Sequence, residues 1–136
     1  MDDVSCISIN YNFIRRPAHK SSNILSYAAR ILIKINGKVY LRDDDFAILD
    51  FALTLREWRK SMLQDLDYYP MDDEGLFIRF IYDKNKYIIE IPQDDISFQV
   101  EPTILLAAID KFLSDFNNDL KKFKDCLSRY HYTLNC

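Results

Sequence analysis

The stretch LSYAARILIKINGKVYL, residues 25–41, carries the pattern that decides how this chain folds. Its apolar side chains recur at every second position: Leu25, Tyr27, Ala29, Ile31, Ile33 and Ile35. A period of two places one set of side chains on a buried sheet face and the other set on a wet face. Asn36-Gly37 then separates this run from KVYL, and the dipeptide favours a type I′ turn because both turn positions need a positive φ. We therefore predict a β-hairpin closed by Asn36 and Gly37.

The same alternation precedes the hairpin. From Val4 to Ile14, apolar residues alternate with Ser8, Asn10 and Asn12, which predicts a first strand. Cys6 falls within this run, where we expect it to be a small core residue. Residues 15–23 break the pattern with a proline and small polar residues, so a loop is expected there.

A helix should follow the hairpin, from Asp45 to Gln64. The sequence RDDD at residues 42–45 offers an aspartate cap and a negative first turn, both of which suit a helix N-terminus. An apolar stripe at helical spacing follows: Ile48, Phe51, Leu55, Trp58 and Met62. This stripe predicts a helix that covers a sheet face, with Trp58 buried.

The second half of the chain repeats this order of elements. Residues 76–83 and 86–91 read as strands joined by a turn at Lys84-Asn85, and residues 96–100 read as a third strand. Glu101-Pro102 opens the last helix, since proline is tolerated in a first turn. Its stripe is Leu105, Ile109, Phe112, Phe116, Leu120, Phe123 and Leu127. Residues 129–136 show no clear period.

The predicted order is therefore β-β-β-α-β-β-β-α. Short turn-like links between strands favour a mainly antiparallel sheet, and two long helices should pack on one of its faces. We predict a single α+β domain over residues 1–136.

Composition narrows the class of protein. Hydrophobic residues make up 49% of the 136 residues, enough for a core, and no apolar run approaches the roughly 20 residues that span a bilayer. The acidic start, MDDVSCISIN, lacks the basic region of a signal peptide. The chain has 3 cysteines, an odd number, and no two of them form a CxxC motif. We therefore expect a cytoplasmic protein with reduced thiols and no membrane partner.

Charge is unevenly distributed along the chain. Residues 65–74, DLDYYPMDDE, hold five of the 21 acidic residues and none of the 18 basic ones. The remainder therefore carries 18 bases against 16 acids, and this one segment changes its net charge of +2 to -3. This uneven distribution of charge indicates which kind of partner the chain attracts, rather than how it folds. A general nucleic-acid binder would show a basic stripe, so direct nucleic-acid binding is not expected.

Catalytic motifs are missing from the sequence. It contains no phosphate loop, GxSxG or HExxH, and its acid clusters fall in predicted loops where water solvates each carboxylate equally. We expect no enzyme, no cofactor and no metal. Two rivals stay open: a small enzyme or ligand-binding domain with a cleft containing Arg79, Tyr87 or Glu90, and a structural homo-oligomer subunit.

The acidic segment is the best candidate for a partner surface. Tyrosine is enriched in interface cores, and acids around it steer a basic partner. The candidate partner-binding residues are Asp67, Tyr68, Tyr69, Asp72, Asp73 and Glu74. A second interpretation stays open, in which one tyrosine folds back onto the core and the acids only keep a loop solvated.

Residues 25–58 resemble a group of small bacterial proteins of unknown function, in which a hairpin leads into F-x-[IV]-L-x-[FL]-A-x-x-L-x-x-W. The matching residues are Phe46, Ile48, Leu49, Phe51, Ala52, Leu55 and Trp58. DYYPMDDEGLFIRFI, residues 67–81, is similar to their aromatic-acidic link and strand.

More broadly, the chain resembles immunity proteins of bacterial polymorphic-toxin and contact-dependent growth inhibition systems. This resemblance implies a small cytoplasmic α+β inhibitor without catalytic activity. Its partner would be a cognate toxin domain, for example a nuclease, which it binds and neutralises. Its oligomeric state stays open.

Overall fold

The computed structural model describes residues 2–15, 27–61, 63–70 and 75–130. Its elements follow in this order: β1 (Asp2–Val4), β2 (Ile7–Arg15), β3 (Ala28–Ile35), β4 (Lys38–Phe46), α1 (Ile48–Lys60), β5 (Leu66–Tyr68), β6 (Ile78–Asp83), β7 (Lys86–Ile91), the 3₁₀ helix η2 (Pro92–Asp94), β8 (Ile96–Val100) and α2 (Pro102–Tyr130). The predicted α+β class and its mainly antiparallel pairing are confirmed.

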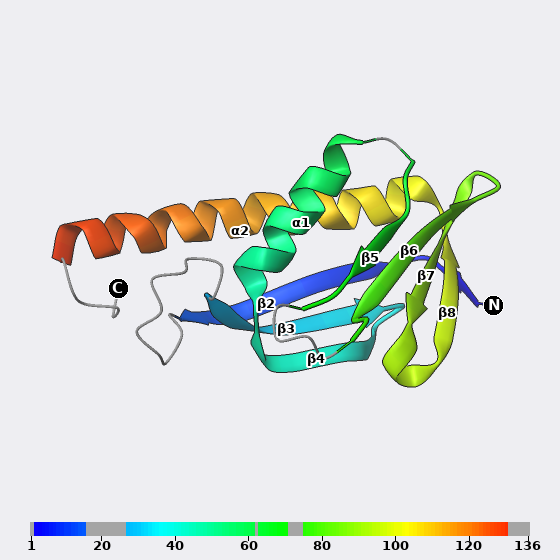
Figure 1. The fold of residues 1–136 in the computed structure, drawn as a ribbon, viewed down its shortest axis with the longest axis horizontal. Coiled ribbons are helices and arrows are strands. Elements are labelled where there is room, and N and C mark those ends of the chain that lie inside the picture. Colours follow the sequence, from blue (N-terminus) through cyan, green and yellow to red (C-terminus); the bar gives the residue numbers. More distant parts are fainter. Residues whose placement is uncertain (1, 16–26, 62, 71–74, 131–136) are drawn as a thin grey trace.

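The strands divide into two sheets, where we expected one. A three-stranded sheet has the order β2-β3-β4, and a five-stranded sheet has the order β1-β8-β7-β6-β5 (Figure 1). Of the described pairings, β1 with β8 is parallel and the others are antiparallel. Two short strands, β1 and β5, were not predicted, because three residues are too few to display a period.

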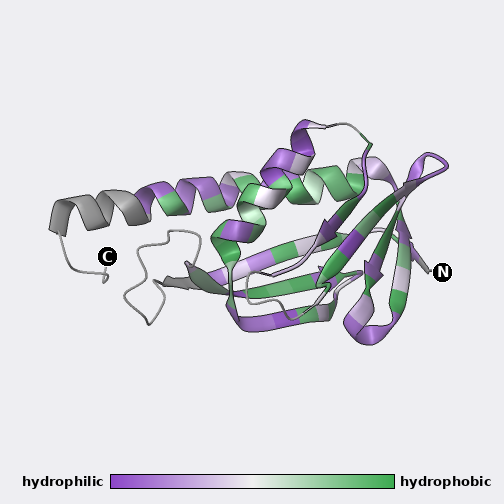
Figure 2. Cartoon of the chain, in the orientation of Figure 1, coloured by the Kyte–Doolittle hydropathy of each residue, from purple (hydrophilic) through white to green (hydrophobic). Residues whose placement is uncertain are grey.

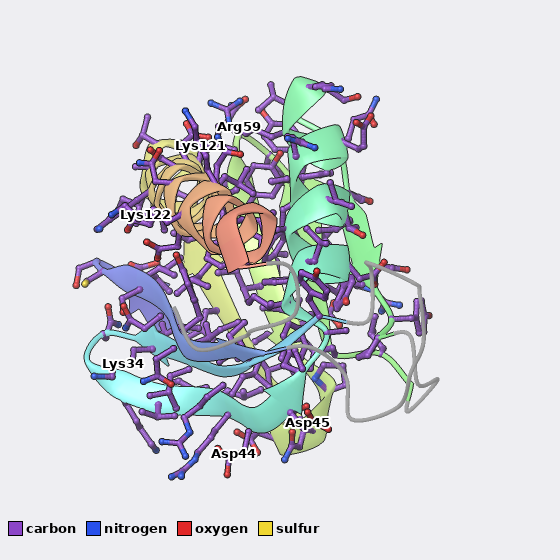
Figure 3. All side chains as sticks on the ribbon, turned by 90° about the vertical axis from the view of Figure 1, so that its left-hand side faces the viewer. Lys34, Asp44, Asp45, Arg59, Lys121 and Lys122 are labelled. Carbon is purple, nitrogen blue, oxygen red and sulfur yellow. The ribbon has the colours of Figure 1, made fainter. Side chains whose placement is uncertain are left out.

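Both sheets and both helices share one core. Buried side chains from β3, α1, β7 and α2 belong to a single apolar cluster. Along β6 to β8, buried residues alternate with more exposed ones, as expected for a sheet with one covered face, and each strand carries hydrophobic residues (Figure 2). Lys34 and Asp44 project from the three-stranded sheet on the side away from the helices (Figure 3).

Both predicted hairpin turns are present. Asn36 and Gly37 have φ values of 52° and 83°, and Lys84 and Asn85 have values of 50° and 68°. The Asn36 side chain does more than turn the chain: its Oδ1 accepts bonds from the backbone N–H groups of Ser5 (2.8 Å) and Cys6 (3.2 Å). The hairpin turn is thereby tied to the link between β1 and β2.

That link interrupts the strand predicted from Val4 to Ile14. Val4 pairs with β8 in the five-stranded sheet, whereas Ile7 pairs with Ile35 in the three-stranded sheet. The chain therefore passes from one sheet to the other at Ser5 and Cys6. The expectation of a buried Cys6 is wrong, because this crossing leaves its side chain exposed.

The aspartates at residues 43–45 do not cap a helix. They continue β4, which ends at Phe46, and the N-cap of α1 is Ala47 without a side-chain cap. Asp44 instead forms ion pairs with two arginines of the sheet: its Oδ1 lies 3.1 Å from Arg30 Nε and 3.5 Å from Arg42 Nε. Cross-strand charge pairing, together with the burial of Phe46, accounts for a strand where local propensity favoured a cap.

The helices bury the stripe residues Ile48, Phe51 and Leu55 of α1 and Leu105, Ile109, Phe112 and Phe116 of α2. Trp58 of α1 is buried, as predicted, although α1 itself spans Ile48–Lys60 and is shorter than expected. Arg59 of α1 reaches α2 through two bonds to Asp110, at 2.9 and 3.1 Å. α2 runs past the sheets at the left of Figure 1 and includes residues 129–130, whereas residues 131–136 lie outside the described part of the chain.

Candidate protein-interaction site

The acidic segment begins on an edge strand. β5 pairs with β6 and forms one edge of the five-stranded sheet. Its three residues alternate: Leu66 and Tyr68 face the core, and Asp67 lies on the outer face. The segment predicted to be a loop is thus partly built into a sheet, which fixes the direction of each side chain.

Tyr68 is a core residue. Its side chain is 2% exposed, and its ring centroid lies 4.8 Å from that of Phe51. The Tyr68 hydroxyl donates to Asp50 Oδ2 of α1 at 2.9 Å. The expectation that Tyr68 anchors a partner is therefore wrong, because its ring and hydroxyl are both engaged inside the fold. The alternative interpretation, one tyrosine folded back onto the core, holds for this residue.

Tyr69 has the opposite environment. It is 52% exposed and belongs, with Val39 and Leu63, to the exposed large apolar side chains of the described residues. Its backbone is held in place because Tyr68 is buried and the Tyr68 carbonyl accepts a bond from the Phe77 N–H at 2.9 Å. Tyr69 is thus an exposed aromatic side chain on an anchored backbone, which reduces the entropy lost on binding.

Asp67 is already paired within the sheet. Its two carboxylate oxygens accept from Arg79 Nε at 2.7 Å and Arg79 Nη2 at 3.3 Å, and the two residues are direct register partners. Asp67 raises the pKa of Arg79, with further contributions from Glu90 and Tyr69. The Asp67 side chain remains 44% exposed, so its carboxylate is partly accessible despite this pair.

The remaining predicted residues, Asp72, Asp73 and Glu74, lie outside the described residues. The chain is described again from Gly75, which has a φ of 92°. The structure therefore brings Asp67 and Tyr69 together at one edge and separates Tyr68 from them.

A groove of about 670 Å³ adjoins this edge. It is formed where three distant segments meet: Arg42 and Asp43 from β4, Pro70 and Gly75–Phe77 beside the acidic segment, and Pro92 with Gln93 from η2. Sequence reasoning missed this groove, since its lining comes from segments whose proximity depends on how the two sheets pack. No local pattern marks it.

The three residues named for the rival cleft do not come together in the fold. Arg79 and Glu90 are register partners on the outer face of the sheet, with Arg79 Nη1 3.7 Å from Glu90 Oε2. Tyr87 points into the core, where it is 0% exposed and its hydroxyl donates to the Gln64 carbonyl at 3.3 Å. Burial raises the pKa of Tyr87. These three residues therefore do not line one pocket.

The described residues contain no group of three or more His, Cys, Asp and Glu side chains that could hold a metal ion. Within the same residues, no helix is both long and apolar enough to cross a bilayer.

Comparison with known proteins gives one match. The model of a family described as a domain of unknown function (DUF7878) matches residues 7–122, a range that includes the acidic segment and the strands from β2 to β8. No curated protein and no solved structure matches the chain.

Proposed function

We propose that this chain, which belongs to the DUF7878 family of domains of unknown function, is a non-enzymatic immunity protein of the bacterial cytoplasm. It would bind a cognate toxin domain and block the active site or substrate path of that domain. The surface that binds the toxin would be the edge formed by Asp67 and Tyr69, continued by the acids Asp72, Asp73 and Glu74.

The observation that carries this proposal is the contrast between two adjacent tyrosines. Tyr68 is 2% exposed and Tyr69 is 52% exposed, so the core holds one ring and the surface presents the other. A large aromatic side chain with few rotatable bonds gives much contact area at a small entropy cost. Nothing in the packing of β5 requires an aromatic residue at position 69, whereas a partner surface would use one.

Charge supports the class of partner. Five acids lie between residues 65 and 74 without a base, so the segment attracts a basic surface and raises the rate of encounter with it. Toxin domains that act on nucleic acid need such basic surfaces to contact phosphates. An acidic inhibitor can occupy that surface in place of the substrate.

The test begins with the neighbouring gene. If that gene encodes a toxin domain, co-expression of this chain should restore growth, and the two proteins should form a complex by calorimetry. Tyr69→Ala should weaken the complex by about 30-fold in Kd, the size expected for an interface hot spot. Val39→Ala is the matched control, because Val39 is also an exposed apolar residue, at 42%, but lies on β4.

Two results would contradict the proposal. One is the absence of a complex with the toxin domain, or a neighbourhood that encodes only metabolic enzymes. The other is a complex whose affinity is unchanged by Tyr69→Ala, which would remove the segment from the interface.

A further inference from the structure

The outer face of the five-stranded sheet bears two aliphatic side chains that the core does not use. Along β6, the buried residues Ile78 and Phe80 alternate with half-exposed Arg79 and Ile81. Along β7, Tyr87, Ile89 and Ile91 are buried and the residues between them are half-exposed. Successive strand residues point to opposite faces, so Ile81 and Ile88 lie on the side away from the core.

The register places these two residues side by side. Ile81 of β6 pairs directly with Ile88 of β7, and Ile88 pairs in turn with Gln99 of β8. They form a small apolar centre on a face that packs against neither helix in the described residues, since the helices contribute to the cluster on the opposite face. Both side chains are half-exposed, so a partner that covers this face can bury more of their apolar surface.

Charged residues surround this centre. On one side, Arg79 lies between Asp67 and Glu90, with which it makes ion pairs at 2.7 and 3.7 Å. On the other side, Asp83 and Lys86 are register partners. We call the set the outer β-face; it consists of Asp67, Tyr69, Arg79, Ile81, Asp83, Lys86, Ile88 and Glu90. An apolar centre within a polar rim is the common arrangement of protein interfaces.

The charge of this face indicates what it binds. Asp67, Asp83 and Glu90 outnumber Arg79 and Lys86, and the acids of residues 72–74 follow at its edge in sequence. The corresponding face of the three-stranded sheet differs: there Leu32 stands between Asn10 and Arg42 in the register, without an aliphatic partner. The acidic face therefore complements a basic protein surface.

We propose that the outer β-face is the centre of the partner interface, with Ile81 and Ile88 receiving an apolar side chain from an otherwise basic protein surface. Tyr69 then contacts the partner beside this apolar centre, at the edge of the sheet, and Arg79 stays paired with Asp67. This inference rests on the proposed function and extends it from one edge to a whole sheet face.

The experiment uses the full chain and the toxin domain encoded beside it. Ile81→Thr and Ile88→Thr keep a β-branched side chain that suits a strand but add a polar group to the apolar centre. Each should weaken the complex at least tenfold in Kd by calorimetry. Leu32→Thr is the matched control, a half-exposed aliphatic residue on the outer face of the other sheet, and should change Kd less than twofold. Ile88→Val, which removes one methylene group, gives a milder variant should Ile88→Thr unfold.

The outcomes separate this inference from the proposed function. If Tyr69→Ala weakens the complex and the Ile81 and Ile88 variants do not, the outer β-face is not the centre of the interface, and the proposed function stands. Loss of affinity in the Ile variants but not in Tyr69→Ala supports the outer β-face, and it overturns the part of the proposed function that places Tyr69 and the acidic segment at the interface. If no complex forms with the toxin domain, both proposals fall. A dimer of the isolated chain that Ile88→Thr dissociates would show that a second copy occupies the face, which also overturns the inference.

Discussion

The Tyr68 hydroxyl donates to the Asp50 carboxylate at 2.9 Å and thereby joins the edge strand β5 to helix α1. The bond helps to hold residues 66–68 in place, within a part of the sequence that is rich in charge. Because Asp50 lies near the start of α1, the contact also fixes the helix against the sheet.

Tyr68→Phe should therefore destabilise the fold by about 1–3 kcal/mol, the range for a partly buried hydrogen bond to a charged acceptor. Urea denaturation measures this loss. Tyr69→Phe is the control, because the Tyr69 ring is largely exposed, and its midpoint should equal that of the wild type. An unchanged midpoint for Tyr68→Phe would mean that the bond to Asp50 contributes nothing net.

Asn36 combines two roles that substitutions can separate. Asn36→Gly should retain the positive φ of the turn and lose the bonds to Ser5 and Cys6. Asn36→Ala should lose these bonds and also the favourable backbone conformation of the turn. We expect Asn36→Ala to cost about 1–2 kcal/mol more than Asn36→Gly, since alanine is strained at positive φ. At the other hairpin, Lys84→Gly is the control for the turn alone, because Lys84 is the first turn residue and has a φ of 50°. Equal losses for the two Asn36 variants would contradict a backbone role.

Trp58 is the single tryptophan, so tryptophan fluorescence reports on the contact between α1 and the residues that lead into β5. Its Nε1–H donates to the Gln64 carbonyl at 2.9 Å, and its ring packs on Phe80 with centroids 5.3 Å apart. Trp58→Phe should cost about 1–3 kcal/mol from the lost bond and the smaller ring. In the wild type, unfolding should shift tryptophan emission to longer wavelength. Emission typical of an exposed indole in the native state would contradict the burial.

Tyr11 should make stability depend on pH in the alkaline range. Burial, followed by the 2.5 Å hydrogen bond to Asp119, raises the pKa of Tyr11 above its ordinary value. The unfolded chain therefore loses the phenolic proton first, above about pH 10. The contribution of Tyr11 to the free energy of unfolding should therefore be complete below that pH, and it should decline as the pH rises toward the pKa of Tyr11 in the folded state.

Denaturant midpoints measured from about pH 8 to about pH 11 test this dependence. Tyr11→Phe should show a shallower decline than the wild type. Some decline should remain, because burial also raises the pKa of Tyr87. Identical slopes for Tyr11→Phe and the wild type would exclude Tyr11 as a source.

Salt should slow association with a basic partner. Charges separated by more than about 8 Å are largely screened at physiological ionic strength, so steering by the acidic segment weakens as salt is added. Stopped-flow measurements with the toxin domain should show a falling association rate, while Tyr69→Ala should mainly raise the dissociation rate. An association rate independent of salt would contradict electrostatic steering.

Local patterns were sufficient for much of the fold. The turn at Asn36-Gly37 was predicted because both residues tolerate positive φ, and the turn at Lys84-Asn85 because it separates two strand-like runs; positive φ is observed at all four residues. The apolar stripes of α1 and α2 predicted two helices and the burial of Trp58. These features depend on neighbours within a few residues, so the chain order alone contains them.

The candidate site was only partly predictable. Its location followed from the charge of residues 65–74, but Tyr68 and Tyr69 are chemically equivalent in the sequence. What distinguishes them is the short pairing of β5 with β6, which turns one ring inward and the next outward. The aliphatic pair Ile81 and Ile88 had a readable signal, since two apolar residues occupy positions on the polar face of their strands.

The sequence was thus enough to set the α+β class, the hairpins, the helices and the acidic segment, because periodicity and turn chemistry are local. The division into two sheets depended on contacts between distant segments. The chain crosses between the sheets at Ser5 and Cys6, where both residues bond to the distant Asn36. The ion pair between Arg30 and Asp44 likewise joins residues that are far apart in sequence. Pairing energies between such segments decide the register, and the register decides which residues a partner can reach.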